Sequence, residues 1–316
     1  MPAVRPLRGP DFGFPPVTSR NTPLTPEETA VRVRGILLIV GAVFFFAFLD
    51  TCAKFAGRNG IPAIEIAWAR YSISVVFAVI ALRPWRHRAD YIMRRPWMQV
   101  WRALFLLGST VLNFFAIRHL QLAETGAIMF AGTLVATALA GPLLGEWPGP
   151  RRWAAVIVGF IGVLIVIQPE PSHFNPAALY SVAASLCYAG YSLSTRVLSH
   201  TESSSSLLIY ASLLATVVLT PALVPVGVWP SNWLVALALV GTGLAGGIGH
   251  WFLIASHRDA PPTVLAPFTY TQLIWMIALG FFAFGDVPGT STLIGAALIV
   301  ASGLYALYRE QVRRDR

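Results

Sequence analysis

Ionisable side chains lie inside long apolar stretches of this sequence, where burying a charge is costly. Arg70 stands about eight residues into one such stretch, and an unpaired guanidinium there would cost about 2.5–3.5 kcal/mol on insertion scales. Asp50 and Glu65 are candidate partners, because their segments would end and begin at the same side of a membrane. Arg70 could therefore bind a ligand carboxylate or an acidic gate, or it could form a structural ion pair.

Asp50 and Lys54 are spaced so that both side chains lie on one face of a helix. The favoured interpretation of Lys54 is structural, as an interfacial partner of Asp50 whose ammonium group extends to the outer surface. Asp50 lies deeper, and a carboxylate at that depth could titrate during a conformational cycle. Coupling to protons therefore stays open.

Polar and amphipathic side chains occur at similar depth in other apolar stretches. Together with Asp50 and Arg70 they predict an aromatic, hydrogen-bonding pocket, which suits a zwitterion or a flat organic solute better than a bare ion. The other members of this predicted pocket are Asn113, Tyr188, Tyr191, His250, Trp251, Tyr270, Gln272 and Trp275. For His250 and Trp251 a second interpretation stays open, namely a histidine satisfied by a neighbouring carbonyl and a tryptophan at the membrane interface.

Glu146 and Asp286 each end an apolar stretch just before a proline turn. A carboxylate in that position can accept the free N–H groups of the next helix. We therefore predict a structural capping role for both residues.

Nucleotide and metal sites are disfavoured by the sequence. The single lysine, Lys54, has no glycine before it, so a Walker A loop is absent and ATP is not expected to be used. The G-x-G-x-x-G pattern at 241–246 lies inside an apolar stretch, where small residues predict close helix packing. Cys52 and Cys187 do not have a metal-binding spacing, so neither a metal nor a cofactor is expected.

One catalytic pattern stays open as an alternative. Ser192, which follows Gly190 and Tyr191, and His250 on another helix resemble the serine and base of an intramembrane serine protease. Leu193 stands where a glycine would be expected, and the sequence does not place the two side chains within hydrogen-bond reach.

Membrane-spanning helices must position these side chains. The 316 residues are 56% hydrophobic and 12% charged, against about 25% charged in a typical soluble domain. Apolar blocks recur at lengths near the ~20 residues that cross a hydrocarbon layer. The predicted spans are 35–55, 62–82, 99–117, 122–145, 150–168, 175–197, 205–226, 230–254, 262–284 and 289–308. We therefore expect an all-α polytopic membrane protein with ten transmembrane helices. The third and fifth spans are the least apolar, because Arg102 lies at the edge of the third and Arg151 and Arg152 at the edge of the fifth.

The basic residues set the orientation of these spans. The net charge is +9, but the arginines flank apolar blocks and do not form a nucleic-acid-binding stripe. With ten spans, only Lys54, Arg58 and Arg118 fall on the side opposite the termini, and Arg70 lies within a span. Because cytoplasmic loops collect Lys and Arg, we predict a multi-pass protein of the inner (plasma) membrane with both termini cytoplasmic.

The chain also repeats weakly. The motif at 145–149 recurs at 285–289, and Arg118 recurs as Arg258. Each half then has five spans, and an odd number forces the second half to enter the membrane from the opposite side, as in inverted-repeat transporters. The expected organisation is a flexible cytoplasmic tail at 1–33, one five-helix repeat at 34–169, a second at 170–308 and a cytoplasmic tail at 309–316.

These residues resemble the drug/metabolite transporter superfamily in its ten-span form with two EamA-type halves. The resemblance covers about residues 35–308 and is most specific at 266–275, 284–288 and 293–303, with Gly145-Glu146, residues 153–162, Asp50, Lys54 and Arg70 in the first half. Asp286 is a departure, because the family more often has Glu there, although the carboxylate is retained. The resemblance implies a secondary carrier of small organic solutes, which is embedded in membrane lipid and transports by alternating access.

The expected function is therefore export of amino acids or related metabolites, driven by gradients rather than by ATP. Two alternatives stay open: an uptake permease for a metabolite, and the intramembrane serine protease described above.

Overall fold

The computed structural model describes residues 25–86, 91–145, 147–168, 174–199 and 201–314, and within these ranges the chain is helical and without strands. We call α1–α5 the first half and α6–α11 the second half. The first half contains α1 (Pro26–Arg58), α2 (Ala63–Leu82), the short 3-10 helix η1 (Pro84–Arg86), α3 (Pro96–Ile117), α4 (Leu122–Leu144) and α5 (Pro150–Ile167). The second half contains α6 (Ala178–Leu198), α7 (Ser204–Leu223), α8 (Trp233–Asp259), α9 (Pro262–Thr269), α10 (Thr271–Phe284) and α11 (Thr290–Arg314).

The predicted tails are partly helical. Thr25 and Glu28 form a capping box, in which each side chain accepts the other residue's backbone N–H, so α1 begins at Pro26 and not at the predicted residue 35. At the other end α11 continues to Arg314. The expectation of a flexible tail at 1–33 is therefore wrong for residues 26–33, and the predicted tail at 309–316 is helical as far as residue 314. Residues 1–24 and 315–316 lie outside the described part of the chain.

The predicted spans are confirmed as helices, with one division. Within the described residues nine helical segments are long and apolar enough to cross a membrane. The remaining predicted span, 175–197, is α6, whose serines and tyrosines lower its hydropathy. The predicted span 262–284 is divided at Tyr270 into α9 and α10, three residues after Pro267, whose ring removes a backbone donor and crowds the preceding turn.

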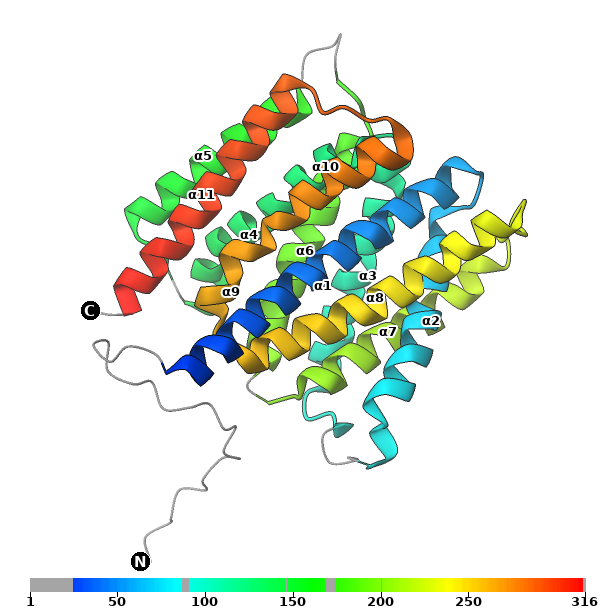
Figure 1. The fold of residues 1–316 in the computed structure, drawn as a ribbon, viewed down its shortest axis with the longest axis horizontal. Helices are drawn as coiled ribbons and strands as arrows, with labels where there is room; N and C mark the ends of the chain where they lie inside the picture. The colour runs from blue at the N-terminus through cyan, green and yellow to red at the C-terminus, as the bar shows by residue number, and fades with distance from the viewer. Residues whose placement is uncertain (1–24, 87–90, 146, 169–173, 200, 315–316) are drawn as a thin grey trace, which may run out of the picture.

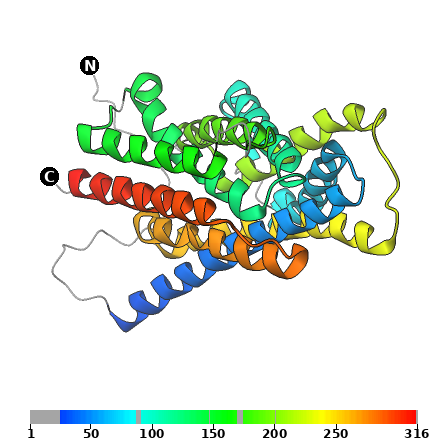
Figure 2. The ribbon, with the colours of Figure 1, turned by 90° about the horizontal axis from the view of Figure 1, so that it is seen from above.

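The two halves contact each other in a symmetric pattern. α1 packs along α8, and its counterpart α6 packs along α3 (Figure 1). α4 contacts α6, just as α9 and α10 contact α1. Two further pairs join equivalent helices, α2 with α7 and α5 with α11, and Figure 2 shows α5 and α11 running side by side. Exchanging the halves reproduces this set of contacts, which is the pattern expected of two repeats that enclose a shared centre.

Glycines allow α5 and α11 to approach closely. A Cβ atom on Gly162 would lie 2.8 Å from the carbonyl oxygen of Gly295, and a Cβ atom on Gly295 would collide with Gly162 and Val166. Backbones at this separation are typical of small-residue helix interfaces in membranes.

We expect Gly295→Leu to separate α5 from α11 and to destabilise the protein by about 1–3 kcal/mol, the usual cost of overpacking. A lowered midpoint of thermal unfolding in detergent would report it. Gly149→Leu is the matched control, because a Cβ atom there meets nothing within 4 Å. Equal midpoints for the two variants would contradict the close packing.

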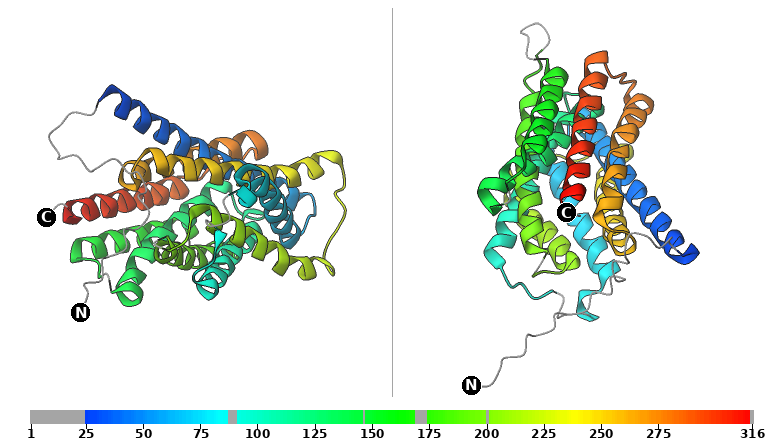
Figure 3. Two further views of the ribbon diagram at one scale, coloured as in Figure 1. Left: turned by 90° about the horizontal axis from the view of Figure 1, so that it is seen from below. Right: turned by 90° about the vertical axis from the view of Figure 1, so that its left-hand side faces the viewer.

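The first turn of α1 and the last turn of α11 lie at the same end of the helix bundle (Figures 1 and 3). We call this the terminal end, and the opposite end, where α1 finishes and α10 joins α11, the distal end.

Candidate functional site

A chamber of about 390 Å³ lies between the two halves. Its walls come from α1, α2, α3, α4 and α5 of the first half and from α6, α8, α9, α10 and α11 of the second. Eight of the ten predicted pocket residues line it: Asp50, Arg70, Asn113, Tyr188, Tyr191, His250, Tyr270 and Gln272. The volume falls in the range of about 300–1,000 Å³ that is usual for small-molecule sites.

The two predicted tryptophans do not line the chamber. Trp251 is 49% exposed on the outside of the bundle, where a lipid-facing role fits the alternative interpretation given to it. Trp275 packs against Phe44 with ring centroids 5.2 Å apart, and among the described residues its buried indole N–H has no acceptor. Both tryptophans shape the bundle rather than the chamber wall.

The chamber reaches further toward the terminal end than toward the distal end. Arg152 in the first turn of α5 and Leu307 near the end of α11 belong to its lining. On the distal side the lining stops at Asp50, Asn113 and Met276, which we call the floor.

The floor presents hydrogen-bond acceptors. Asn113 Nδ2 donates to Asp50 Oδ1 at 3.3 Å, and both residues are buried. Among the described groups, Asn113 Oδ1 is buried without a partner. A buried acceptor without a donor is rare in native proteins, so a ligand N–H or a water would be well placed here.

Arg70 projects from α2 into the chamber without an ion pair. Its Nη1 donates to Thr110 Oγ1 at 2.6 Å, and its guanidinium lies over the ring of Tyr71 at 5.0 Å. Among the described residues, Arg70 forms no ion pair within 4.0 Å. The predicted partner Asp50 lines the same chamber but bonds Asn113 instead.

Glu65, the other predicted partner of Arg70, has a different role. Its Oε2 accepts from the backbone N–H of Val228 at 2.9 Å and so ties α2 to the connection between α7 and α8. The expectation that Glu65 faces Arg70 is therefore wrong. A carboxylate early in a helix can accept from the backbone of a loop that packs beside it, and spacing along the chain does not show which loop that is.

Arg102 is a buried cation that the sequence reasoning missed. It was assigned to the edge of a span, whereas α3 begins earlier than predicted and carries Arg102 inside the bundle with 4% exposure. Its Nε donates to Thr195 Oγ1 at 2.7 Å, its Nη1 to the Leu207 carbonyl at 2.9 Å, and its Nη2 to Tyr191 Oη at 3.3 Å. The sequence did contain an indication that Arg102 is buried, because this arginine lies several residues inside a helix whose next turns are apolar.

A second, smaller cavity of about 240 Å³ adjoins the chamber. Arg70, Tyr191 and His250 line both spaces, and Arg102 lines the smaller one. We call the smaller space the side lobe. The two cavities therefore adjoin at Arg70, Tyr191 and His250, and Arg70 and Arg102 are the arginines among the described residues that line the side lobe.

His250 is held in place by its own helix. Its Nδ1 lies 2.9 Å from the Gly246 carbonyl, and its ring meets Phe46 edge to face at 4.9 Å. The other ring nitrogen is left for the cavities that His250 lines. The hydrogen bond matches the alternative interpretation of a satisfied histidine, and the position matches the predicted pocket.

The proposed serine–histidine pair is not assembled. In the part of the chain that the structure describes, the hydrogen bond recorded for His250 is to Gly246, and Ser192 lines neither cavity.

Gly243, within the G-x-G-x-x-G pattern, lies where a Cβ atom would collide with Ile73 of α2, as expected for helix packing.

Aromatic rings cover much of the chamber wall. Tyr188 and Tyr191 lie with ring centroids 5.8 Å apart, and Tyr270 lies 5.0 Å from Phe130. Tyr188 also rests on Gly132 of α4, where a side chain would displace it. Rings held at these positions offer flat surfaces from α4, α6 and the break between α9 and α10.

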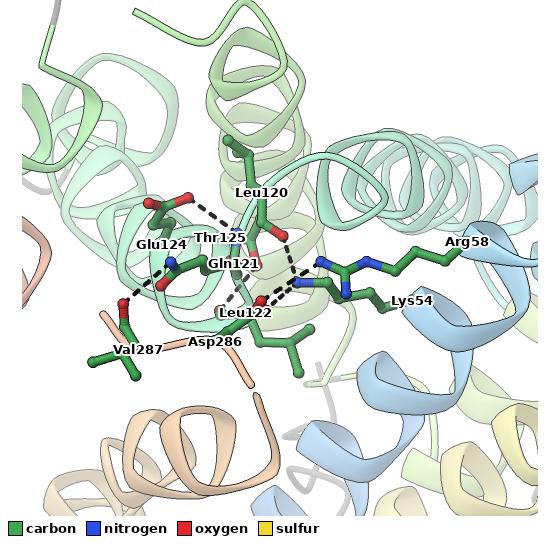
Figure 4. Close-up of polar contacts among 9 residues, drawn as sticks. All are labelled: Lys54, Arg58, Leu120, Gln121, Leu122, Glu124, Thr125, Asp286 and Val287. Carbon is green, nitrogen blue, oxygen red and sulfur yellow. Dashed lines mark hydrogen bonds and ion pairs between the residues drawn. The ribbon is translucent and has the colours of Figure 1, made fainter. Parts of the chain in front are cut away.

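The distal end is closed by a polar layer that joins the halves. Lys54 Nζ donates to Asp286 Oδ2 at 2.5 Å and to the Leu120 carbonyl at 2.8 Å (Figure 4). Arg58 Nη2 approaches Asp286 Oδ1 at 3.5 Å, and Gln121 donates to the Val287 carbonyl at 3.2 Å. We call these contacts the distal layer. They connect α1 and the α3–α4 turn of the first half to the α10–α11 connection of the second.

The distal layer corrects two sequence predictions. Lys54 has no exposed surface and pairs with Asp286, so its predicted extension to the outer surface and its predicted pairing with Asp50 are wrong. Asp286 serves two cations of α1, rather than the N–H groups of α11 for which it was predicted. Glu146, for which the same capping role was predicted, lies outside the described residues.

Comparisons with known proteins agree with this arrangement. A model of the EamA-like transporter family matches residues 33–168 and again residues 175–308. A riboflavin transporter of Vibrio cholerae is 28% identical over 90% of this chain and 97% of its own. An S-adenosylmethionine uptake transporter of Rickettsia conorii is 27% identical over 84% of this chain and 90% of its own. A solved structure described only as a crystal structure of a protein shares the fold, with a TM-score of 0.61, 18% identity and coverage of 89% of this chain and 98% of its own.

Proposed function

The chain belongs to the EamA-like transporter family, and we propose that it is a secondary importer of a metabolite built on a flat heteroaromatic ring. Riboflavin and S-adenosylmethionine, for which the two relatives are named, both contain a fused nitrogen heteroaromatic ring system. The Rickettsia relative is named for uptake. Amino-acid export, which the resemblance had led us to expect, is not supported by these relatives.

The observation that carries this proposal is the make-up of the chamber. Tyr188, Tyr191 and Tyr270 give it flat aromatic walls. A flat ring can stack on such walls whichever atoms make up the ring. At the floor, Asp50 and Asn113 supply acceptors for ring N–H or amino groups. Aromatic walls with a few placed polar groups are typical of sites for organic solutes rather than for bare ions.

The mechanism is alternating access between the two halves. The chamber extends to the terminal end, and the distal layer closes it on the other side. With the terminal end in the cytoplasm, as the distribution of Lys and Arg favours, this structure corresponds to the state from which an importer releases its solute inside. The opposite state requires the distal layer to open and the terminal end to close.

The proposal is tested by uptake into proteoliposomes that contain the purified full chain and no ATP. We expect time-dependent accumulation or counterflow of labelled riboflavin or of an adenine-containing solute, and an imposed proton gradient decides whether transport is coupled to protons. Counterflow of amino acids without transport of any heteroaromatic solute would overturn the proposal.

Tyr188 provides a specific prediction for this site. We expect Tyr188→Ala to weaken solute binding about tenfold, because stacking of a ring on an aromatic side chain contributes about 1–3 kcal/mol. Tyr188→Phe should bind normally, since the flat surface remains. The measurement is the dissociation constant in detergent.

Trp251→Ala is the matched control, because it removes an aromatic ring from the outside of the bundle. If Tyr188→Ala and Trp251→Ala leave binding equally intact, Tyr188 does not stack on the solute.

A further inference from the structure

Positive charge exceeds negative charge along the two cavities. Among the described residues, their lining includes the arginines Arg70, Arg102 and Arg152 and one acidic side chain, Asp50. Arg70 and Arg102 form no ion pair with a described carboxylate within 4.0 Å. A buried cation without a counter-ion is costly, so such groups in a membrane protein usually meet a partner in the working cycle.

The guanidinium groups of Arg70 and Arg102 each have N–H donors that are not used in the hydrogen bonds described above. A guanidinium has five N–H donors in a planar fork. The three recorded hydrogen bonds of Arg102 all go to neutral acceptors on Thr195, Leu207 and Tyr191. Arg70 has one recorded hydrogen bond, to Thr110. The remaining N–H groups suit the oxygens of a carboxylate or a phosphate, which arginine recognises in pairs.

The nearby carboxylates are engaged elsewhere. Glu202, which follows α6, accepts the backbone N–H groups of Arg94 and Arg95 at 2.8 and 3.0 Å and so anchors the segment that leads into α3. Asp50 bonds Asn113 at the floor. Neither neutralises Arg102 through a contact within 4.0 Å, so the side lobe keeps its positive charge.

The positions of the two arginines indicate where the parts of a bound solute would lie. The side lobe joins the chamber at Arg70, Tyr191 and His250, and it continues past them to Arg102. A ring stacked in the chamber would therefore send a side arm between Tyr191 and His250 toward Arg102.

Resting on the proposed function, we propose that the solute is a heteroaromatic anion, whose carboxylate or phosphate arm enters the side lobe and binds Arg102 together with Arg70. The ring occupies the chamber, and the arm replaces the water that otherwise solvates the two guanidinium groups. A neutral relative of the same solute loses this interaction, and a cationic one is repelled.

The test measures dissociation constants of the purified full chain for two matched pairs of probes. Nicotinamide and nicotinate differ by a carboxylate, and riboflavin and riboflavin 5′-phosphate differ by a phosphate, so the two pairs also tell which oxyanion is preferred. We expect the anionic member of at least one pair to bind tenfold or more tightly than the neutral member. Arg102→Gln should abolish that advantage while changing the affinity for the neutral member less than twofold, and Arg102→Lys should retain part of it.

A purely structural Arg102 gives a different result. It ties α3 to α6 and α7, so a structural defect would weaken binding of both members of a pair alike and lower the unfolding midpoint. Arg118→Gln is the control for a general loss of positive charge, because Arg118 is exposed at the distal end.

Two results overturn the inference and are distinguishable. If in both pairs the neutral member binds as well as its anionic partner, or if the anionic advantage survives in Arg102→Gln, the anion site is wrong and the proposed import of a heteroaromatic solute stands. If none of the four probes binds, this inference fails, and counterflow of an adenine-containing solute decides separately whether the proposed function stands.

Discussion

Arg70→Ala is expected to reduce solute transport at least tenfold while the protein still inserts and folds. The guanidinium lines both the chamber and the side lobe and has one recorded hydrogen bond, to Thr110. Most of its donors are therefore available to a solute, and a hydrogen bond to a charged group contributes about 1.5–3 kcal/mol. At about 1.4 kcal/mol for each factor of ten, the loss of one such contact gives roughly a tenfold to hundredfold weaker interaction.

Counterflow in proteoliposomes measures this effect at matched protein content. Arg70→Lys should retain partial activity, because the charge remains and the planar fork is lost. Arg118→Ala removes an exposed guanidinium from the distal end and should transport normally. Unchanged flux in a well-folded Arg70→Ala protein would show that Arg70 only packs against Tyr71 and Thr110.

Local sequence signals were sufficient to predict where the helices lie, apart from the division of the span 262–284. Apolar blocks of about twenty residues and proline–glycine breakers set the spans, because the bilayer leaves few alternatives for a backbone that must satisfy its own hydrogen bonds. The exceptions are also local. The capping box at Thr25 and Glu28 extends α1, and Pro267 precedes the division between α9 and α10.

Part of the chamber lining could also be predicted, since eight of the ten candidates lie on it, whereas lining residues such as Thr133 and Arg152 were not among the candidates. Polar residues inside spans are costly in lipid and therefore turn toward the protein interior. This argument is weakest for tryptophan, which is equally suited to the lipid interface, and Trp251 is exposed there.

The partners of the charged residues could not be predicted. Lys54 and Asp286 are 232 residues apart in the sequence, and spacing along α1 favoured Asp50 instead. Arg102 was assigned to a membrane edge, because α3 was expected to begin a few residues later than it does. The start of the helix decides whether the side chain of Arg102 reaches water or the side lobe. Pairing across two halves depends on how the helices cross, which a single sequence does not specify.

The distal layer is asymmetric, and this predicts which substitution is the more harmful. Asp286→Ala leaves the fully buried Lys54 ammonium with the Leu120 carbonyl as its recorded partner, and breaking a buried pair in this way costs about 3–5 kcal/mol. Lys54→Met leaves Asp286 partly exposed and still beside Arg58 at 3.5 Å. We therefore expect a lower unfolding midpoint in detergent for Asp286→Ala than for Lys54→Met, and the reverse order would contradict the burial of Lys54.

The double variant Lys54→Met with Asp286→Leu separates stability from gating. Replacing both members of a buried pair with apolar side chains is often neutral for stability, so the midpoint should recover relative to Asp286→Ala. The attraction that holds the halves together at the distal end is nevertheless lost, and we expect the population to shift toward a state open at that end. Arg58 is 43% exposed and remains solvated without Asp286.

A cysteine at the chamber floor reports this shift. In a background without Cys52 and Cys187, Met276→Cys lies on the lining beneath the distal layer. A membrane-impermeant thiol reagent added on the distal side should label it slowly with the pair intact and severalfold faster in the double variant. Arg34→Met with Asp259→Leu is the matched control, because that pair joins α1 to α8 at 2.7 Å near the terminal end. Equal labelling in the two double variants would mean that apolar packing, and not the Lys54–Asp286 pair, keeps the distal end closed.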